Sequence, residues 1–133
     1  MGNSIVVYMG IIIDVNSPNW EQEVLKSNTL TVVDFWHNRC PYCLMLVPTY
    51  NELAEEYQGK IKFVRMNVLE DPGNREITLR YGVMGTPTLV FFCEGRPVGQ
   101  VVGFVAKAQL KKEMDDILEK HKECVKQSTE LKI

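Results

Sequence analysis

The sequence has no hydrophobic run long enough to cross a lipid bilayer and no excess of basic charge. Its apolar segment 5–13 has only nine residues, whereas a membrane-spanning helix needs about 20. No basic residue precedes this segment and no small-residue cleavage site follows it, so we expect no secretory signal. The net charge is −2, which gives no support for a nucleic-acid partner. We therefore expect a cytoplasmic protein with neither a membrane nor a nucleic-acid partner.

Cysteine and histidine are also scarce, with four Cys and two His in 133 residues. Structural zinc normally takes four ligands, with a second close pair beside the first. In the sequence, Cys93, Cys124, His37 and His121 supply no such second pair. We therefore expect no metal, and a zinc or iron–sulfur protein stays open only as a remote alternative.

Cys93 and Cys124 stand far from any other cysteine in the sequence, and we expect no catalytic role for either. Free cysteine is commonly buried, so Cys93, in an apolar segment, is expected to act as a small hydrophobic residue. Cys124 is expected to be a passive thiol, with an intermolecular disulfide as the alternative. A chain of this length buries a core that needs no disulfides, and no repeat or linker divides it. We expect a single domain over residues 1–133.

One pair of cysteines is close in the sequence, in the motif Cys40-Pro41-Tyr42-Cys43. It lies between an apolar segment, residues 30–36, and a helical pattern that begins near Pro41. Two thiols three positions apart at a helix start can form a disulfide. The helix N-terminus favours the thiolate of the first, as does the neighbouring Arg39. The motif predicts a redox site in which Cys40 is the nucleophile and the more buried Cys43 is the resolving thiol.

Hydrophobic periodicity predicts strands alternating with helices along the chain. The expected strands are residues 11–13, 29–36, 61–68, 88–93 and 98–104, with a turn at 94–97 joining the last two. The expected helices run from an N-cap at Ser17 to about Lys26, from Pro41 to about Gln58, from Asp71 to Tyr81, and from Ala106 along an apolar stripe to Val125. This order predicts an α/β protein with a mixed sheet, helices on both faces and an antiparallel hairpin at one edge.

Two residues depart from these patterns. Asp34 is a carboxylate inside a strand that is expected to be buried, so it must raise its pKa or find a partner. From the residues alone, a general base and a hydrogen-bonded structural aspartate are equally acceptable. Pro48 lies inside the helix that starts at Pro41 and should kink it.

Taken together, these motifs resemble the thioredoxin family over roughly residues 10–118. The resemblance is carried by Val33-Asp34-Phe35-Trp36, Cys40-x-x-Cys43, Pro48, Gly85-Thr86-Pro87-Thr88, the Glu94-Gly95 turn and Gly103. It implies the thioredoxin fold, a central mixed five-stranded sheet flanked by four helices. The N-terminal residues and a C-terminal helical segment extend beyond this core.

The resemblance also implies a function: a thiol-disulfide oxidoreductase that reduces protein disulfides through Cys40 and Cys43. Asp34 would handle the proton of Cys43, and Arg65 aligns with a family Lys that can approach this Asp. A separate thioredoxin reductase-type donor would recharge the Cys40–Cys43 pair, no cofactor would be needed, and we expect a monomer. The Thr86-Pro87 bond is expected to be cis, with an ordinary trans bond as the alternative. The implied substrate-binding residues are Trp36, Pro41, Tyr42, Met84, Gly85, Thr86, Pro87 and Gly103, with Phe104 beside them; for Trp36 and Phe104 a simple core position is the alternative.

The departures from the family pattern leave the redox potential open. Pro41-Tyr42 replaces the usual Gly-Pro and resembles the glutaredoxin dipeptide, Arg39 replaces a Trp, and Leu44 replaces a frequent Lys. Glutaredoxin-like activity is therefore one alternative, and a disulfide oxidase or isomerase is another.

Overall fold

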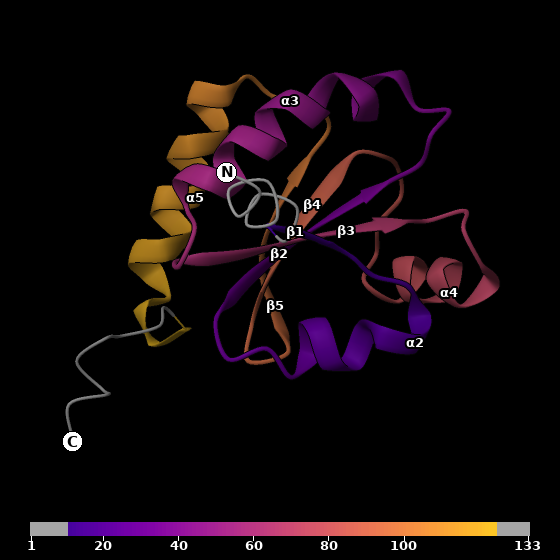
Figure 1. The fold of residues 1–133 in the computed structure, drawn as a ribbon, viewed down its shortest axis with the longest axis horizontal. Coiled ribbons are helices and arrows are strands. Elements are labelled where there is room, and N and C mark those ends of the chain that lie inside the picture. The colour runs from indigo at the N-terminus through magenta and orange to yellow at the C-terminus, as the bar shows by residue number, and fades with distance from the viewer. Residues whose placement is uncertain (1–10, 125–133) are drawn as a thin grey trace, which may run out of the picture.

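The computed structural model describes residues 11–124 and has the predicted α/β architecture (Figure 1). One mixed sheet contains, in spatial order, β1 (Ile12–Asp14), β3 (Ile61–Asn67), β2 (Leu30–Trp36), β4 (Thr88–Cys93) and β5 (Arg96–Val102). β1, β3 and β2 are parallel, whereas β4 is antiparallel to both β2 and β5. The sheet order and the antiparallel hairpin at its edge are those of the thioredoxin fold, as predicted.

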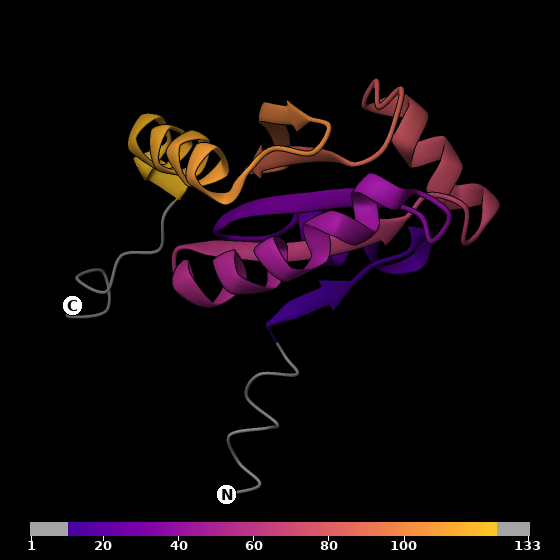
Figure 2. The same ribbon diagram turned by 90° about the horizontal axis from the view of Figure 1, so that it is seen from above.

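Four helical segments cover the two faces of the sheet. They are α2 (Ser17–Trp20) with its π-helical continuation Glu21–Leu25, α3 (Pro41–Glu56), α4 (Pro72–Arg80) and α5 (Lys107–Lys120), after which a 3-10 turn covers Lys122–Cys124. α3 and α5 pack on one face, and α2 and α4 on the other (Figure 1). Figure 2 shows α3 running along the sheet. None of the helices within residues 11–124 combines the length and apolarity that crossing a membrane requires.

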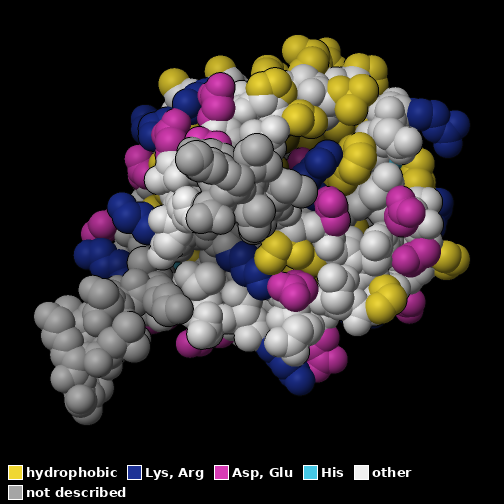
Figure 3. Space-filling view, in the orientation of Figure 1, with side chains coloured by type: hydrophobic (Ala, Val, Ile, Leu, Met, Phe, Trp, Pro, Cys, Tyr) yellow, Lys and Arg dark blue, Asp and Glu magenta, His cyan; other side chains and the backbone are white. Residues whose placement is uncertain are grey.

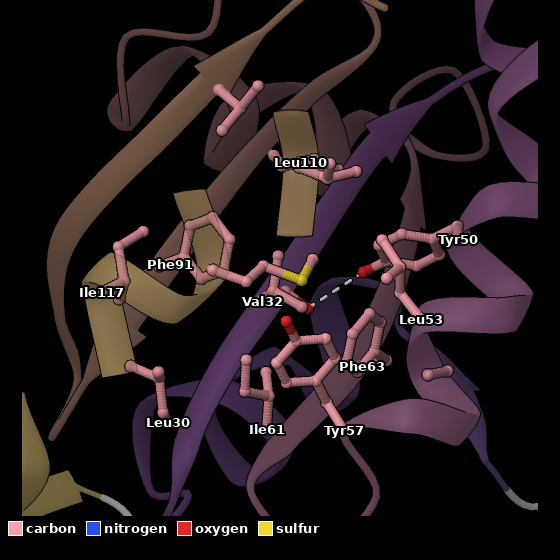
Figure 4. Packing of buried hydrophobic residues seen from close by; sticks show 14 of the residues in the cluster. Leu30, Val32, Tyr50, Leu53, Tyr57, Ile61, Phe63, Phe91, Leu110 and Ile117 are labelled. Carbon is pink, nitrogen blue, oxygen red and sulfur yellow. Dashed lines mark hydrogen bonds between the residues drawn. The ribbon is translucent and has the colours of Figure 1, made fainter. Parts of the chain in front are cut away.

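β2 lies at the centre of the sheet and is buried on both sides. Because side chains alternate along a strand, Val32 packs in the cluster under α3 and α5, and Val33 packs in the one under α2 and α4. Tyr50 of α3 donates its hydroxyl to the carbonyl oxygens of Val32 at 3.2 Å, drawn in Figure 4, and of Val64 at 2.7 Å. These bonds attach α3 to the sheet on which the cysteine motif depends.

The first helix begins differently from the sequence prediction. Its N-cap is Asn16, and the predicted cap, Ser17, is the first helical residue. The side chain of Asn74 in α4 decides this, because its Oδ1 accepts the Ser17 N–H at 2.7 Å and its Nδ2 donates to Asn16 Oδ1 at 2.7 Å. Asn and Ser are equally favoured at an N-cap, so this partner 57 residues away along the chain, together with the local bond from the Asn16 N–H to Asn19 Oδ1, selects Asn16.

The last two elements also have different limits. β5 begins at Arg96, because the turn consists of Glu94 and Gly95 alone, with φ of 54° and 80°. Two successive positive φ values are typical of the tight hairpin turn that matches strand twist. α5 ends at Lys120, earlier than predicted, and Val125 lies outside the described residues.

The expectation for Cys93 and Cys124 was wrong. Their side chains form a disulfide, with the Cα atoms 5.7 Å apart and a sequence separation of 31. Cys93 ends β4, and Cys124 returns to it on the 3-10 turn after α5. Both cysteines are buried. Within the described chain no cysteine is free.

Candidate active site

The Cys40–Cys43 motif occupies the junction between β2 and α3. Cys40 is the N-cap of α3, with extended backbone angles, and Pro41 occupies the first turn, where its missing N–H costs no helical bond. The two cysteines form a disulfide with Cα atoms 5.2 Å apart. Cys40 is 7% exposed and Cys43 is 1% exposed. The predicted pairing, and the deeper burial of Cys43, are both confirmed.

Backbone groups of the helix start face the sulfur of Cys40. The Cys43 N–H points at Cys40 Sγ over 3.1 Å. An N–H in the first turn of a helix stabilises negative charge. In the reduced protein this contact favours a thiolate at Cys40.

The loop before β4 lies against the same sulfur. Thr86-Pro87 is a cis peptide, as predicted, and the Thr86 carbonyl oxygen is 3.4 Å from Cys40 Sγ. The Pro87 carbonyl accepts the N–H of Gly103 at 2.8 Å, and Gly103 has a φ of +85° that favours glycine. Two segments predicted to bind substrate, the 85–87 loop and Gly103, therefore meet beside Cys40.

Asp34 is buried in β2 without adequate compensation. It is 2% exposed, and its Oδ1 has no hydrogen-bond partner among the described residues. Burial raises the pKa of Asp34 to about 7, although the nearby charge of Arg65 partly opposes this increase. The alternative of a fully hydrogen-bonded structural aspartate does not fit an orphaned carboxylate oxygen.

Asp34 shares the face of the sheet that α3 covers. Its neighbour two residues earlier, Val32, packs in the α3 cluster, and strand alternation places Asp34 on that side. The pKa of the Tyr50 hydroxyl in α3 is raised, first by its burial and second by the nearby charge of Asp34. Cys43 is buried at the start of the same helix, seven residues before Tyr50, so Asp34 and Cys43 lie in the same layer.

Arg65 connects Asp34 to the protein surface. It pairs in register with Asp34 across β2 and β3, and its guanidinium carbon lies 4.2 Å from the ring centroid of Trp36. Trp36 itself is half-buried. The Arg65 charge that acts on Asp34 thus also makes a cation–π contact with Trp36, a residue predicted to bind substrate.

Apolar side chains surround the disulfide on the outer surface. Met84 is 92% exposed and Tyr42 is 60% exposed, and the Tyr42 ring stacks on Phe104 with centroids 6.5 Å apart. Figure 3 shows hydrophobic side chains gathered along the upper rim of the molecule, where α3 lies. Phe104, at 37% exposed, is therefore a surface residue rather than a core residue.

The sequence prediction missed part of this surface. Leu44 and Met45 are both about half exposed on α3, next to the cysteine motif. The signal was present, because both apolar residues fall off the buried stripe that Cys43 and Leu46 define. On the other side of the 85–87 loop, a hollow of about 240 Å³ is lined by residues that include His37, Arg75, Leu79, Met84 and Thr86.

His37 shapes the approach to Cys40. Its carbonyl oxygen accepts the Cys40 N–H at 3.3 Å, and its Nδ1 accepts the Arg39 N–H at 3.2 Å. These bonds hold the loop between β2 and α3. His37 therefore has a structural part in the loop, while Arg39 is exposed.

The disulfide-bonded pair at a helix N-terminus, with a cis-proline loop beside Cys40 Sγ, can exchange with the disulfides of other molecules, which defines a thiol-disulfide oxidoreductase. Comparison with known proteins agrees with it. The family model described as Thioredoxin matches residues 11–116. The chain belongs to the thioredoxin family and is a protein-disulfide oxidoreductase.

Individual relatives come from several kinds of organism. Thioredoxin 1 of Nostoc sp. is 39% identical over 113 residues, which cover 85% of this chain and 99% of the relative. Thioredoxin of Pseudomonas aeruginosa is 38% identical over 104 residues, 78% of this chain and 94% of the relative. A chloroplastic M-type thioredoxin of Brassica napus is 39% identical over 105 residues, 79% of this chain, but the chain spans only 58% of that relative.

Proposed function

We propose that this protein reduces disulfide bonds of other proteins, with Cys40 as the nucleophile and Cys43 as the resolving thiol. The observation that carries the proposal is the position of Cys40 Sγ, which receives the Cys43 N–H at 3.1 Å at the start of α3. This contact stabilises a thiolate there, and the thiolate is the species that attacks a disulfide.

The reaction proceeds in two exchanges. The Cys40 thiolate bonds to one sulfur of the substrate disulfide, and the other substrate sulfur leaves as a thiolate that takes up a proton. Cys43 then loses its proton and attacks Cys40 Sγ, which releases the second substrate thiol. Two electrons pass from the dithiol to the substrate, and the Cys40–Cys43 disulfide is formed.

Asp34 is proposed as the proton acceptor for Cys43. A general base works best with a pKa near the working pH, and the Asp34 pKa of about 7 meets this condition. A water molecule is proposed to carry the proton between the two groups, because both belong to the layer between the sheet and α3. The role explains why a carboxyl group with an orphaned oxygen is kept in the core.

The substrate is proposed to be an extended segment of a protein with a disulfide. Its backbone would pair with that of Thr86 in the 85–87 loop, as in strand addition. Its apolar side chains would contact the surface formed by Trp36, Pro41, Tyr42, Met84, Gly85, Thr86, Pro87 and Gly103. Flexible Met84 suits contacts with varied partners.

We further propose a monomer of 15.3 kDa with one domain over residues 1–133, recharged by a thioredoxin reductase-type donor and without a cofactor. A cytoplasmic site would supply the reducing conditions such a dithiol needs. Sedimentation checks the mass, and cell fractionation checks the compartment, for which a chloroplast is the alternative raised by the M-type relatives.

A glutathione-coupled, glutaredoxin-like activity is the second candidate. It is favoured by the Pro41-Tyr42 dipeptide and by the exposure of the Tyr42 ring at the rim of the site. The buried Asp34 and the β1–α2 unit before β2 favour the thioredoxin type instead.

One experiment distinguishes the two functions. Reduction of a protein disulfide such as that of insulin is followed with NADPH and either thioredoxin reductase or glutathione plus glutathione reductase. The proposal requires faster turnover with thioredoxin reductase. Turnover that depends on glutathione would transfer the assignment to the glutaredoxin-like alternative.

A further inference from the structure

The second cysteine pair lies far from the active site and has different chemistry around it. Cys93 is at the opposite end of β4 from Thr88, the residue that follows the cis-proline loop. Thr88 and Cys93 are therefore separated along the strand by roughly five residues at about 3.3 Å each. Cys40 lies beside Thr86, at the Thr88 end of this strand. The pair cannot exchange directly with the Cys40–Cys43 disulfide within one molecule.

The turn after α5 brings a carboxylate, that of Glu123, to this pair. The Cys124 N–H donates to the His121 carbonyl at 3.0 Å, which folds residues 121–124 back on the sheet. One carboxylate oxygen of Glu123 then lies 3.7 Å from Cys93 Sγ and 3.7 Å from His121 Nδ1. The Sγ atoms of Cys93 and Cys124 and this carboxylate lie within 4.8 Å of one another.

The separation between the Glu123 carboxylate and Cys93 Sγ matches that between two ligand atoms of a tetrahedral metal site. Ligand atoms at 2.0–2.3 Å from a tetrahedral zinc ion lie roughly 3.3–3.8 Å apart. The 3.7 Å separation between Glu123 and Cys93 Sγ is within that range. Two thiolates and one carboxylate are groups that zinc accepts as ligands, and a water molecule would complete a four-coordinate site.

Electrostatics separate this pair from the catalytic one. Cys40 faces an N–H at a helix start, which favours a free thiolate. Cys93 is instead fully buried, and a carboxylate oxygen of Glu123 lies 3.7 Å from its Sγ. The nearby Lys122 is directed to Glu119, 3.1 Å away. A cation between the two sulfurs and this carboxylate would therefore face groups of opposite charge.

We propose that Cys93, Glu123 and Cys124 form a second thiol centre that binds a zinc-class divalent cation when reduced and releases it on forming the disulfide. Cation binding displaces the two thiol protons. Oxidation by a small disulfide then joins the two protein sulfurs, and the cation leaves. The two electrons given up by the protein thiolates, with two protons from solution, reduce the small disulfide to two thiols. The proposal is independent of the function assigned to Cys40.

The test uses the full chain with Cys40→Ser and Cys43→Ser, so that the catalytic thiols cannot bind the metal. The reduced protein is titrated with Zn²⁺ against a chromogenic chelator in the absence of oxygen. We expect one equivalent to bind, and none after oxidation to the Cys93–Cys124 disulfide. Co²⁺ in place of Zn²⁺ should give the thiolate charge-transfer band and the visible absorption of a tetrahedral site.

Ligand variants in this background provide the controls. Cys93→Ala should abolish binding. Glu123→Gln, an exposed position that preserves the fold, should weaken binding at least about tenfold. Glu119→Gln, a carboxylate on the preceding turn of α5 outside the site, should bind as the background does. Equal Zn²⁺ binding with and without Cys93, or equal affinity of the Glu123 and Glu119 variants, would overturn the proposal.

Discussion

The carbonyl oxygen of Thr86 lies 3.4 Å from Cys40 Sγ, although 46 residues separate the two along the chain. This contact places the backbone that is proposed to pair with a substrate directly beside the sulfur that is proposed to attack it. In the reduced protein a Cys40 thiol can donate to this carbonyl, and deprotonation breaks that bond. Substrate binding and thiolate chemistry are therefore expected to act at one point on the surface.

The two-step mechanism predicts different outcomes for the two cysteine variants. Cys40→Ser removes the nucleophile, so protein-disulfide reduction should be abolished. Cys43→Ser keeps the attack but lacks the resolving thiol, so a mixed disulfide between Cys40 and the substrate should accumulate, detectable by mass spectrometry. Cys93→Ala is the matched control and should keep turnover. Full multiple turnover by Cys43→Ser contradicts the mechanism.

Asp34 as a general base predicts a pH-dependent resolving step. With a pKa of about 7, Asp34 becomes protonated as the pH falls, so release of the mixed disulfide should slow about tenfold per pH unit below that value. Asp34→Asn should lower the rate roughly 10²-fold or more at pH 8 and remove this dependence. Stopped-flow measurement of the second exchange tests it. An unchanged profile in Asp34→Asn excludes the role.

The same burial predicts an effect on stability with a defined sign. The folded-state pKa of Asp34 is raised from 3.8 to about 7, so the folded state binds a proton more tightly than the unfolded state. The resulting stability is present below about pH 4 and is lost as the pH rises through 7. Asp34→Asn should therefore raise the free energy of unfolding at pH 8 by about 4 kcal/mol relative to its effect at pH 3, where the carboxyl group is mostly protonated in both states.

Arg65 is predicted to limit the pKa of Asp34. Its charge opposes the effect of burial, so Arg65→Gln should raise the Asp34 pKa above about 7, which a carboxyl titration by NMR or infrared spectroscopy measures. Lys62→Gln is the control, because this residue of the same strand binds Glu23 at 2.7 Å over the other face of the sheet. An equal shift in both variants would attribute the effect to net charge rather than to the Asp34–Arg65 pairing.

The Cys93–Cys124 disulfide is predicted to stabilise the oxidised protein. It closes a loop of 31 residues, for which the chain-entropy relation gives about 3–4 kcal/mol. Cys124→Ala should lose about that much unfolding free energy in denaturant titrations without reductant. With excess reductant, the difference from the parent protein should largely disappear. A difference that persists under reduction would assign the effect to packing of the side chain instead.

Much of the fold and of the catalytic site could be predicted because their signals are local. Strand and helix periods fix the element order, and the cysteine motif itself contains both thiols that meet at α3. The Asp34 anomaly was visible as a charge in an apolar strand. The pairing of Cys93 with Cys124 was not predictable in this way, because it depends on where the chain turns after α5.

The other errors have the same origin. The cap at Asn16 depends on Asn74, 58 residues away, and Ser17 is an equally good local candidate when that partner is ignored. The exposure of Leu44 and Met45 could have been inferred from the helical stripe. Its significance depends on the 85–87 loop and Gly103, which the fold brings beside α3.

The most direct test of the central claim is an equilibrium redox titration of Cys40–Cys43, read by thiol alkylation and peptide mass so that Cys93–Cys124 is followed separately. A protein-disulfide reductase requires a reversible two-electron couple with a potential near about −270 mV. A potential near about −180 mV or above would contradict reduction as the function and indicate an oxidase or isomerase. The absence of any reversible couple would contradict the redox role of this pair altogether.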